Sequence, residues 1–108
     1  MPPTILEALG LGSTSIQFLL SPPHPYYAAY EVTGYRIRYK NLGVANELYQ
    51  TKEFPAGTMR ANLTGLDGYG TYCLSALAIT SKGPGIYGPC TTVMIGKGGK
   101  SEKNIIKN

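Results

Sequence analysis

Apolar and polar residues alternate along several short segments of the chain, which is the period of half-buried β-strands. The clearest segment is residues 35–40, where two tyrosines and an isoleucine alternate with three cations. On the same basis, we expect further strands at residues 6–11, 16–20, 48–52, 59–64, 72–79 and 92–95. The pattern therefore predicts seven strands and no helix.

Turn-forming residues separate these segments at intervals of about 8–12 residues, a spacing typical of β-sandwiches and barrels. Three prolines interrupt residues 21–25, and a run rich in glycine and proline spans residues 81–89. With 14 glycines, 9 tyrosines and 15% charged residues among 108, the composition also favours strands over helices. We predict one folded domain over residues 1–95 and a flexible basic tail or linker over residues 96–108.

The formal net charge of +4 comes mostly from this tail, which holds four lysines and one glutamate. The folded part is therefore almost neutral, and we expect no nucleic-acid binding, because that needs a basic patch on the folded surface. No apolar run approaches the roughly 18 residues of a membrane span. Residues 1–3 do not resemble the start of a signal peptide.

The order of motifs along residues 3–95 resembles that of a fibronectin type III domain. The resemblance implies an immunoglobulin-like, seven-stranded β-sandwich with Greek-key connections. The residues that carry it are Pro3, Leu6, Ala8 and Leu11; Ser15, Ile16 and Phe18; Leu20–Pro23; Gly34–Tyr39; Leu63–Leu66 with Tyr72; Leu74, Ala76 and Ala78; and the glycine–proline turns at 83–85 and 88–89.

The spacing of Leu66 and Tyr72 is similar to the tyrosine corner of this family, in which a buried phenol hydroxyl bonds upstream backbone. The sequence departs from the family at two positions. Leu20 stands where a core tryptophan is usual, and no proline follows Leu66. An immunoglobulin domain proper is disfavoured, because the chain contains no tryptophan.

Residues for enzyme chemistry are scarce, and we predict neither an enzyme nor a cofactor. His24 is the only histidine, and it lies in the proline-rich segment without an orienting partner nearby in sequence. One histidine and two cysteines fall short of the four ligands of a zinc site. No glycine-rich loop precedes a helix, so a phosphate-binding loop is not expected.

Cys73 and Cys90 lie on the last two predicted strands, joined by the loop 81–89. If that whole segment is the turn, Cys73 faces a residue near Gly96, roughly 20 Å from Cys90 along the ladder. A disulfide needs Cα atoms within about 7 Å. We therefore predict two free thiols, which are more typical of a reducing compartment.

Two further surface features bear on function. Asn62-Leu63-Thr64 is an N-glycosylation sequon, and Asn62 falls on the outward phase of its strand. Four tyrosines lie in predicted loops, and exposed tyrosine gives a large contact area at low entropic cost. The predicted partner-binding residues at this loop end are Tyr26, Tyr27, Tyr30, Ile86 and Tyr87. By contrast, we assign Tyr35, Tyr39 and Tyr72 to the core.

A second candidate surface is the outward face of the strands at 35–40 and 72–79. There, Leu77 and Ile79 are expected to point outward beside Arg36 and Arg38. An outward apolar pair on a sheet suggests contact, although the loop end offers more aromatic area.

The resemblance implies a non-enzymatic module for protein–protein contact or spacing, in a larger cell-surface receptor or adhesion protein. We expect the isolated domain to be monomeric, with other proteins or neighbouring domains as its partners. An intracellular module that binds a partner peptide is the alternative, and the predicted free thiols favour it. An accessory module of an enzyme is a third class.

Overall fold

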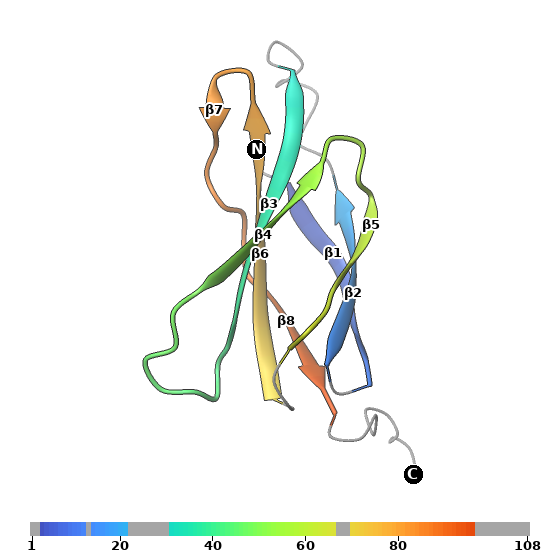
Figure 1. Ribbon diagram of the computed structural model, residues 1–108, viewed down its shortest axis with the longest axis vertical. Coiled ribbons are helices and arrows are strands. Elements are labelled where there is room, and N and C mark those ends of the chain that lie inside the picture. The colour runs from blue at the N-terminus through green and yellow to red at the C-terminus, as the bar shows by residue number, and fades with distance from the viewer. Residues whose placement is uncertain (1–2, 13, 22–30, 67–69, 97–108) are drawn as a thin grey trace.

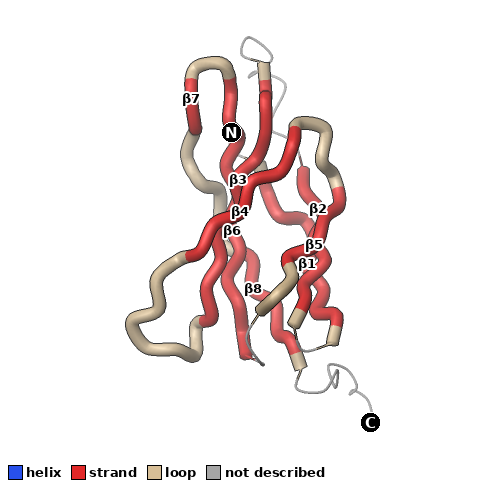
Figure 2. The backbone as a smooth tube through the Cα atoms, viewed as in Figure 1, coloured by secondary structure: helices blue, strands red, loops and turns tan. Residues whose placement is uncertain are grey.

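The computed structural model describes residues 3–12, 14–21, 31–66 and 70–96. These residues form two antiparallel β-sheets packed as a sandwich, as Figures 1 and 2 show. The strands are β1 (Thr4–Leu11), β2 (Ser15–Ser21), β3 (Val32–Asn41), β4 (Gln50–Pro55), β5 (Arg60–Leu63), β6 (Gly70–Thr80), β7 (Gly83–Pro84) and β8 (Thr91–Ile95). The predicted all-β sandwich is confirmed, with eight strands rather than seven. Within the described ranges, no helix is long and apolar enough to cross a membrane.

One sheet has three strands in the order β1-β2-β5, and the other has five. In the five-stranded sheet the order is β4-β3-β6-β7, and β8 also pairs with β6. The chain changes sheet between β2 and β3, between β4 and β5, and between β5 and β6. These crossings tie the two sheets together, so neither sheet is a simple meander.

The core lies between the sheets and contains most of the residues predicted from the alternating pattern, although Leu6 and Leu11 of the first strand are exposed. From the three-stranded sheet, Ile16, Phe18 and Leu20 are almost fully buried. From β3, the side chains of Tyr35 and Tyr39 are buried as predicted. The buried cluster also contains Ile5, Ile37, Leu63, Leu66, Tyr72, Leu74, Ala76, Ala78, Val93 and Ile95.

The crossing before β6 contains the two residues that the resemblance assigns to a tyrosine corner, Leu66 and Tyr72. Leu66 is buried, and its backbone N–H donates a hydrogen bond to the Thr14 carbonyl at 2.9 Å. Tyr72 is only 4% exposed, which confirms its assignment to the core. The turn between them includes residues 67–69, which lie outside the described residues.

The hairpin after β6 turns earlier than the sequence suggested. Its turn is at Ser81-Lys82, so that Thr80 pairs with Gly83 and Ile79 pairs with Pro84. The chain then continues beside β6, where the N–H groups of Gly85 and Gly88 donate to carbonyls of β6 at 2.9 Å. The final strand is thus divided into β7 and β8, which explains the additional strand.

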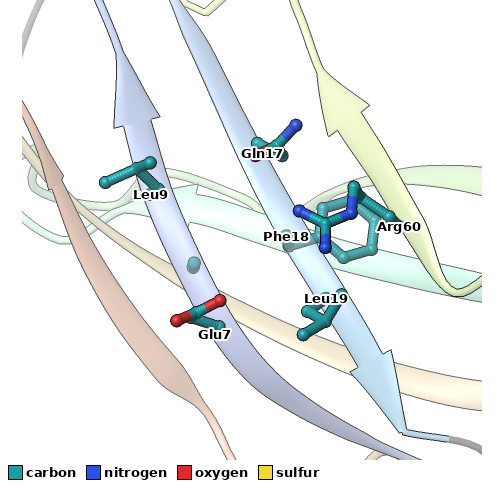
Figure 3. A pocket seen from close by; sticks show the side chains of 7 residues that line it. Glu7, Leu9, Gln17, Phe18, Leu19 and Arg60 are labelled. Atoms are coloured by element: carbon teal, nitrogen blue, oxygen red, sulfur yellow. The ribbon is translucent and has the colours of Figure 1, made fainter.

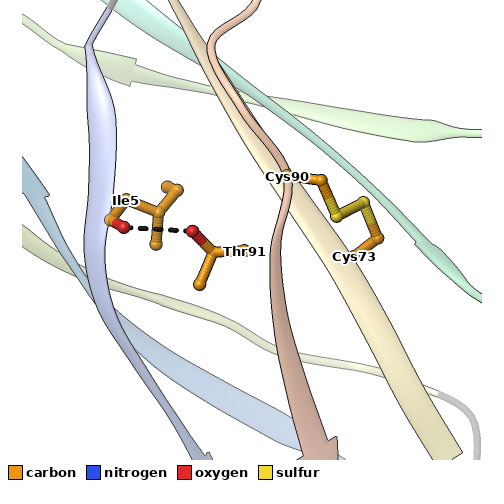
Figure 4. The surroundings of a disulfide bond; sticks show 4 residues. All are labelled: Ile5, Cys73, Cys90 and Thr91. Carbon is orange, nitrogen blue, oxygen red and sulfur yellow. Dashed lines mark hydrogen bonds between the residues drawn. A yellow bond between two sulfur atoms is a disulfide. The ribbon is translucent and has the colours of Figure 1, made fainter.

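This early turn brings the two cysteines together, and the prediction of free thiols is wrong. Cys73 pairs in register with Thr92 rather than with a residue near Gly96. Cys90 precedes β8 and forms a disulfide with Cys73, with Cα atoms 5.6 Å apart (Figure 4). The prediction was wrong because it took all of residues 81–89 as the turn. This shifted the expected pairing of the last strand with β6 by several residues.

One side of the sandwich closes where β1 meets β8, in a contact between the two sheets. The Thr91 hydroxyl donates a hydrogen bond to the Ile5 carbonyl at 3.1 Å (Figure 4). Nearby, a Cβ atom at Gly10 would lie 2.8 Å from the Met94 carbonyl oxygen. Glycine at this position therefore permits the close approach of the two strands.

Candidate interaction surface

The outer face of the five-stranded sheet carries a group of cations and tyrosine rings. Because Tyr35, Ile37 and Tyr39 point into the core, the alternate residues of β3 point outward. We call this surface the basic–aromatic face. Its members are Arg36, Arg38, Lys40, Tyr49 and Tyr87.

Arg38 lies at the centre of this face, in contact with rings from both sides of β3. Its guanidinium carbon is 4.3 Å from the Tyr49 ring centroid and 4.2 Å from the Tyr87 centroid. Tyr49 immediately precedes β4, whereas Tyr87 lies between β7 and β8. Such cation–π contacts are worth about 0.5–2 kcal/mol each, depending on how far the cation is desolvated.

The hydrogen-bonding capacity of Arg38 is not used by protein acceptors among the described residues. Its Nε atom is buried and has no hydrogen-bond partner there. Buried donors in native proteins usually have an acceptor. Stacking against rings, rather than hydrogen bonding, therefore holds this guanidinium in place.

The two other cations of β3 differ in their surroundings. Arg36 Nε donates a hydrogen bond to Glu53 Oε2 at 2.9 Å, across the β3–β4 pair. This hydrogen bond raises the pKa of Arg36, and the nearby Tyr87 hydroxyl acts in the same direction. Lys40, at the other end of the row, places its ammonium nitrogen 4.6 Å from the Tyr49 centroid.

Tyr87 reaches this face because the segment before β8 stays hydrogen-bonded to β6. Gly85 and Gly88 donate to the carbonyls of Ala78 and Ala76, so that the residues between them run beside Leu77. Tyr87 is half-buried over the sheet and does not stand at a loop tip. Tyr87 lies in the segment between β7 and β8, as expected, and this segment runs along the sheet.

The two apolar residues expected on this outer face are not an exposed patch. Leu77 pairs in register with Arg36, but its side chain is only 4% exposed. Ile79 is half-buried. Arg36 flanks Leu77 on one side and the segment containing Tyr87 flanks it on the other, which leaves little apolar surface open.

Other predicted site residues are spread over the molecule. Ile86 is 74% exposed, and Asn62 is exposed on β5, where it pairs in register with Gln17. Tyr26, Tyr27 and Tyr30 lie outside the described residues. The structure therefore assembles a surface around Tyr87 but does not describe the whole predicted loop end.

The opposite, three-stranded sheet has a shallow hollow of about 330 Å³ on its outside (Figure 3). It is lined by Glu7, Ala8, Leu9, Gln17, Phe18, Leu19 and Arg60. Its single carboxylate lacks a histidine or nucleophile among these residues. Across the described part of the chain, no cluster of three metal-ligating side chains exists either.

Sequence reasoning identified the outward cations but missed their arrangement with Tyr49 and Tyr87. The signal for Arg38 was the alternation of residues 35–40, which already placed it opposite the core. The two rings come from segments 11 and 49 residues away in sequence, so only the sheet topology brings them to Arg38.

Comparison with solved structures gives matches over most of the chain. The FN5 domain of Drosophila Lar matches with a TM-score of 0.71 and 28% identity, covering 91% of this chain and 100% of that domain. The chain has the fibronectin type III fold. The third fibronectin III domain of human KIAA0343 has a TM-score of 0.76 and 19% identity, over 85% of this chain and 78% of that one. The fn3 domain of human contactin 1 has a TM-score of 0.73 and 21% identity, over 90% of this chain and 78% of that one.

No protein-family model matches the sequence, and no curated protein matches it. The chain contains no tryptophan, and Leu20 stands where the resemblance to type III domains implies one. The type III fold is nevertheless retained, because Leu20 is buried with the tyrosines of β3 in one continuous core.

Proposed function

We propose that this chain is a non-enzymatic type III module that provides protein contact or spacing within a larger protein. The observation that carries the proposal is Arg38, held between two tyrosine rings on the outer face of the five-stranded sheet. Tyrosine and arginine are the residue types enriched at binding hot spots. We further propose that the module acts as a monomer and takes no cofactor.

The layout of the sandwich suits a module joined in line with others. β1 begins toward one end of the long axis, and β8 finishes toward the opposite end (Figure 1). Neighbouring domains attached at these two ends would leave both outer sheet faces accessible. The proposed division places a folded module at residues 1–95 and a linker at residues 96–108.

The proposed setting is extracellular or on the cell surface. The Cys73–Cys90 disulfide supports an oxidising compartment, because such bonds are rare in the cytosol. Asn62 would be a glycosylation site there, since its side chain is exposed on β5. The intracellular alternative was favoured by two free thiols, whereas the two cysteines form a disulfide.

The loop end remains a second proposed contact surface. Ile86 is the most exposed apolar residue close to Tyr87 in sequence. Tyr26, Tyr27 and Tyr30 would extend this surface. Substitutions at Ile86 and at Arg38 test the two surfaces separately.

The test is a binding screen of the purified, oxidised domain against an array of recombinant ectodomains. We expect at least one specific partner, whose binding is lost in Arg38→Gln and Tyr87→Ala and retained in Ile86→Ser. Thermal unfolding of each variant checks that it is folded. If Arg38→Gln and Tyr87→Ala both retain binding and Ile86→Ser loses it, the contact lies at the loop end. An absence of any partner would contradict the proposed contact function.

A further inference from the structure

The chemistry of the basic–aromatic face indicates the kind of partner that it accepts. Two of its three outward cations, Arg38 and Lys40, have no acidic partner among the described residues. Glu53 is paired with Arg36, and the Glu47 carboxylate accepts the Asn41 backbone N–H at 2.9 Å. Arg38 and Lys40 therefore form no ion pair with the carboxylates of the described residues.

The spacing of these two cations defines a pattern for the ligand. Arg38 and Lys40 are two residues apart on one strand, which places their backbone positions about 7 Å apart. In an extended peptide, side chains two residues apart on one face have the same separation. Two carboxylates at alternate positions of such a peptide could therefore meet both cations at once.

We infer that the partner presents an extended acidic segment with glutamate or aspartate at alternate positions. This inference rests on the proposed contact function. One carboxylate pairs with the Arg38 guanidinium, whose planar donors match a carboxylate in two parallel hydrogen bonds. The next acid pairs with Lys40. Glu53 stands beside Arg36, so a third acid at that end would meet a negative charge, and a neutral or basic residue is favoured there.

The rings prepare the arginine for this contact. Tyr49 and Tyr87 restrict the guanidinium without consuming its donors, which lowers the entropic cost of binding. Tyr49 is 38% exposed, so it also offers apolar area beside the charges. A lysine at position 38 would retain the charge but lose both the planar fork and much of the stacking.

The test is a two-dimensional NMR titration of the oxidised domain with a blocked peptide of alternating threonine and glutamate. We expect shifts at Arg38, Lys40 and the two tyrosines, and no shifts with the glutamine version of the peptide. Arg38→Lys should weaken binding by about tenfold or more, because a charge-assisted bidentate pair is lost.

A control variant separates this site from net charge. Arg60→Gln removes one positive charge on the opposite sheet. It should bind the peptide within about twofold of wild type. If Arg60→Gln weakens binding as much as Arg38→Lys, the attraction is only general charge and the inference is wrong.

Two other results would overturn the inference, and each would show whether the ligand class or the contact function was wrong. A heparin oligosaccharide that shifts the same residues at lower concentration than the peptide would make a sulfated polysaccharide the ligand class. No peptide binding, alongside an ectodomain partner that still requires Arg38, would leave the contact function intact and reject the acidic segment. If neither peptide nor ectodomain binds, both proposals fail.

Discussion

Individual residues in this sandwich are constrained where two backbone segments meet closely. Gly70, the first residue of β6, has a φ of +146°, and a Cβ there would lie 2.8 Å from both polar atoms of the Asn41 side chain. Asn41 cannot move freely, because it is buried and its Oδ1 accepts the Gly43 N–H at 2.8 Å. Glycine is thus required by conformation and by space.

Gly70→Ala should lower the free energy of unfolding by about 1–3 kcal/mol from backbone strain alone. Chemical denaturation monitored by tyrosine fluorescence measures this change. Gly85→Ala is the matched control, since its Cβ would meet only the Ala78 carbonyl at 3.4 Å. We expect the control to stay within about 1 kcal/mol of wild type. Equal midpoints for both variants would contradict the proposed constraint at Gly70.

At the scale of single strands, period-2 alternation predicted where most elements lie and which side of β3 is buried. It assigned Tyr35 to the core because one face of β3 is buried. β6 is buried on both faces, since Cys73 and Leu77 are covered as well as Leu74. The alternation does not indicate register. The turn at Ser81-Lys82 could not be distinguished from the following glycines and prolines, and a shift of a few residues separated Cys73 from Cys90.

The disulfide should contribute to stability because it links positions 17 residues apart. A loop of about this length gives an entropic stabilisation on the order of 3 kcal/mol. Urea unfolding with and without reductant should show this difference in the wild type and none in the Cys73→Ala, Cys90→Ser variant. A wild-type midpoint that reductant leaves unchanged, or two thiols titrating in the denatured unreduced protein, would contradict the bond.

At the scale of the whole molecule, the outer faces of the two sheets are chemically different. The five-stranded sheet presents Arg38 and Lys40 among tyrosines, whereas the three-stranded sheet presents the shallow hollow and exposed Asn62. The sequence predicted the outward cations and Asn62, but not the rings around Arg38. Those contacts depend on strand order, which brings together segments from opposite sides of β3. We propose partner contact at the first face and a glycan at the second.

The measurement that tests this account most directly is hydroxyl-radical footprinting of the oxidised domain, free and bound to an ectodomain partner. Binding should protect Tyr49 and Tyr87, because both rings lie on the basic–aromatic face. Leu9 and Met94, which are 57% and 67% exposed on β1 and β8, should react equally in both states. Protection confined to Ile86 and residues 22–30, with Tyr49 still reactive, would contradict the account and assign the contact to the loop end.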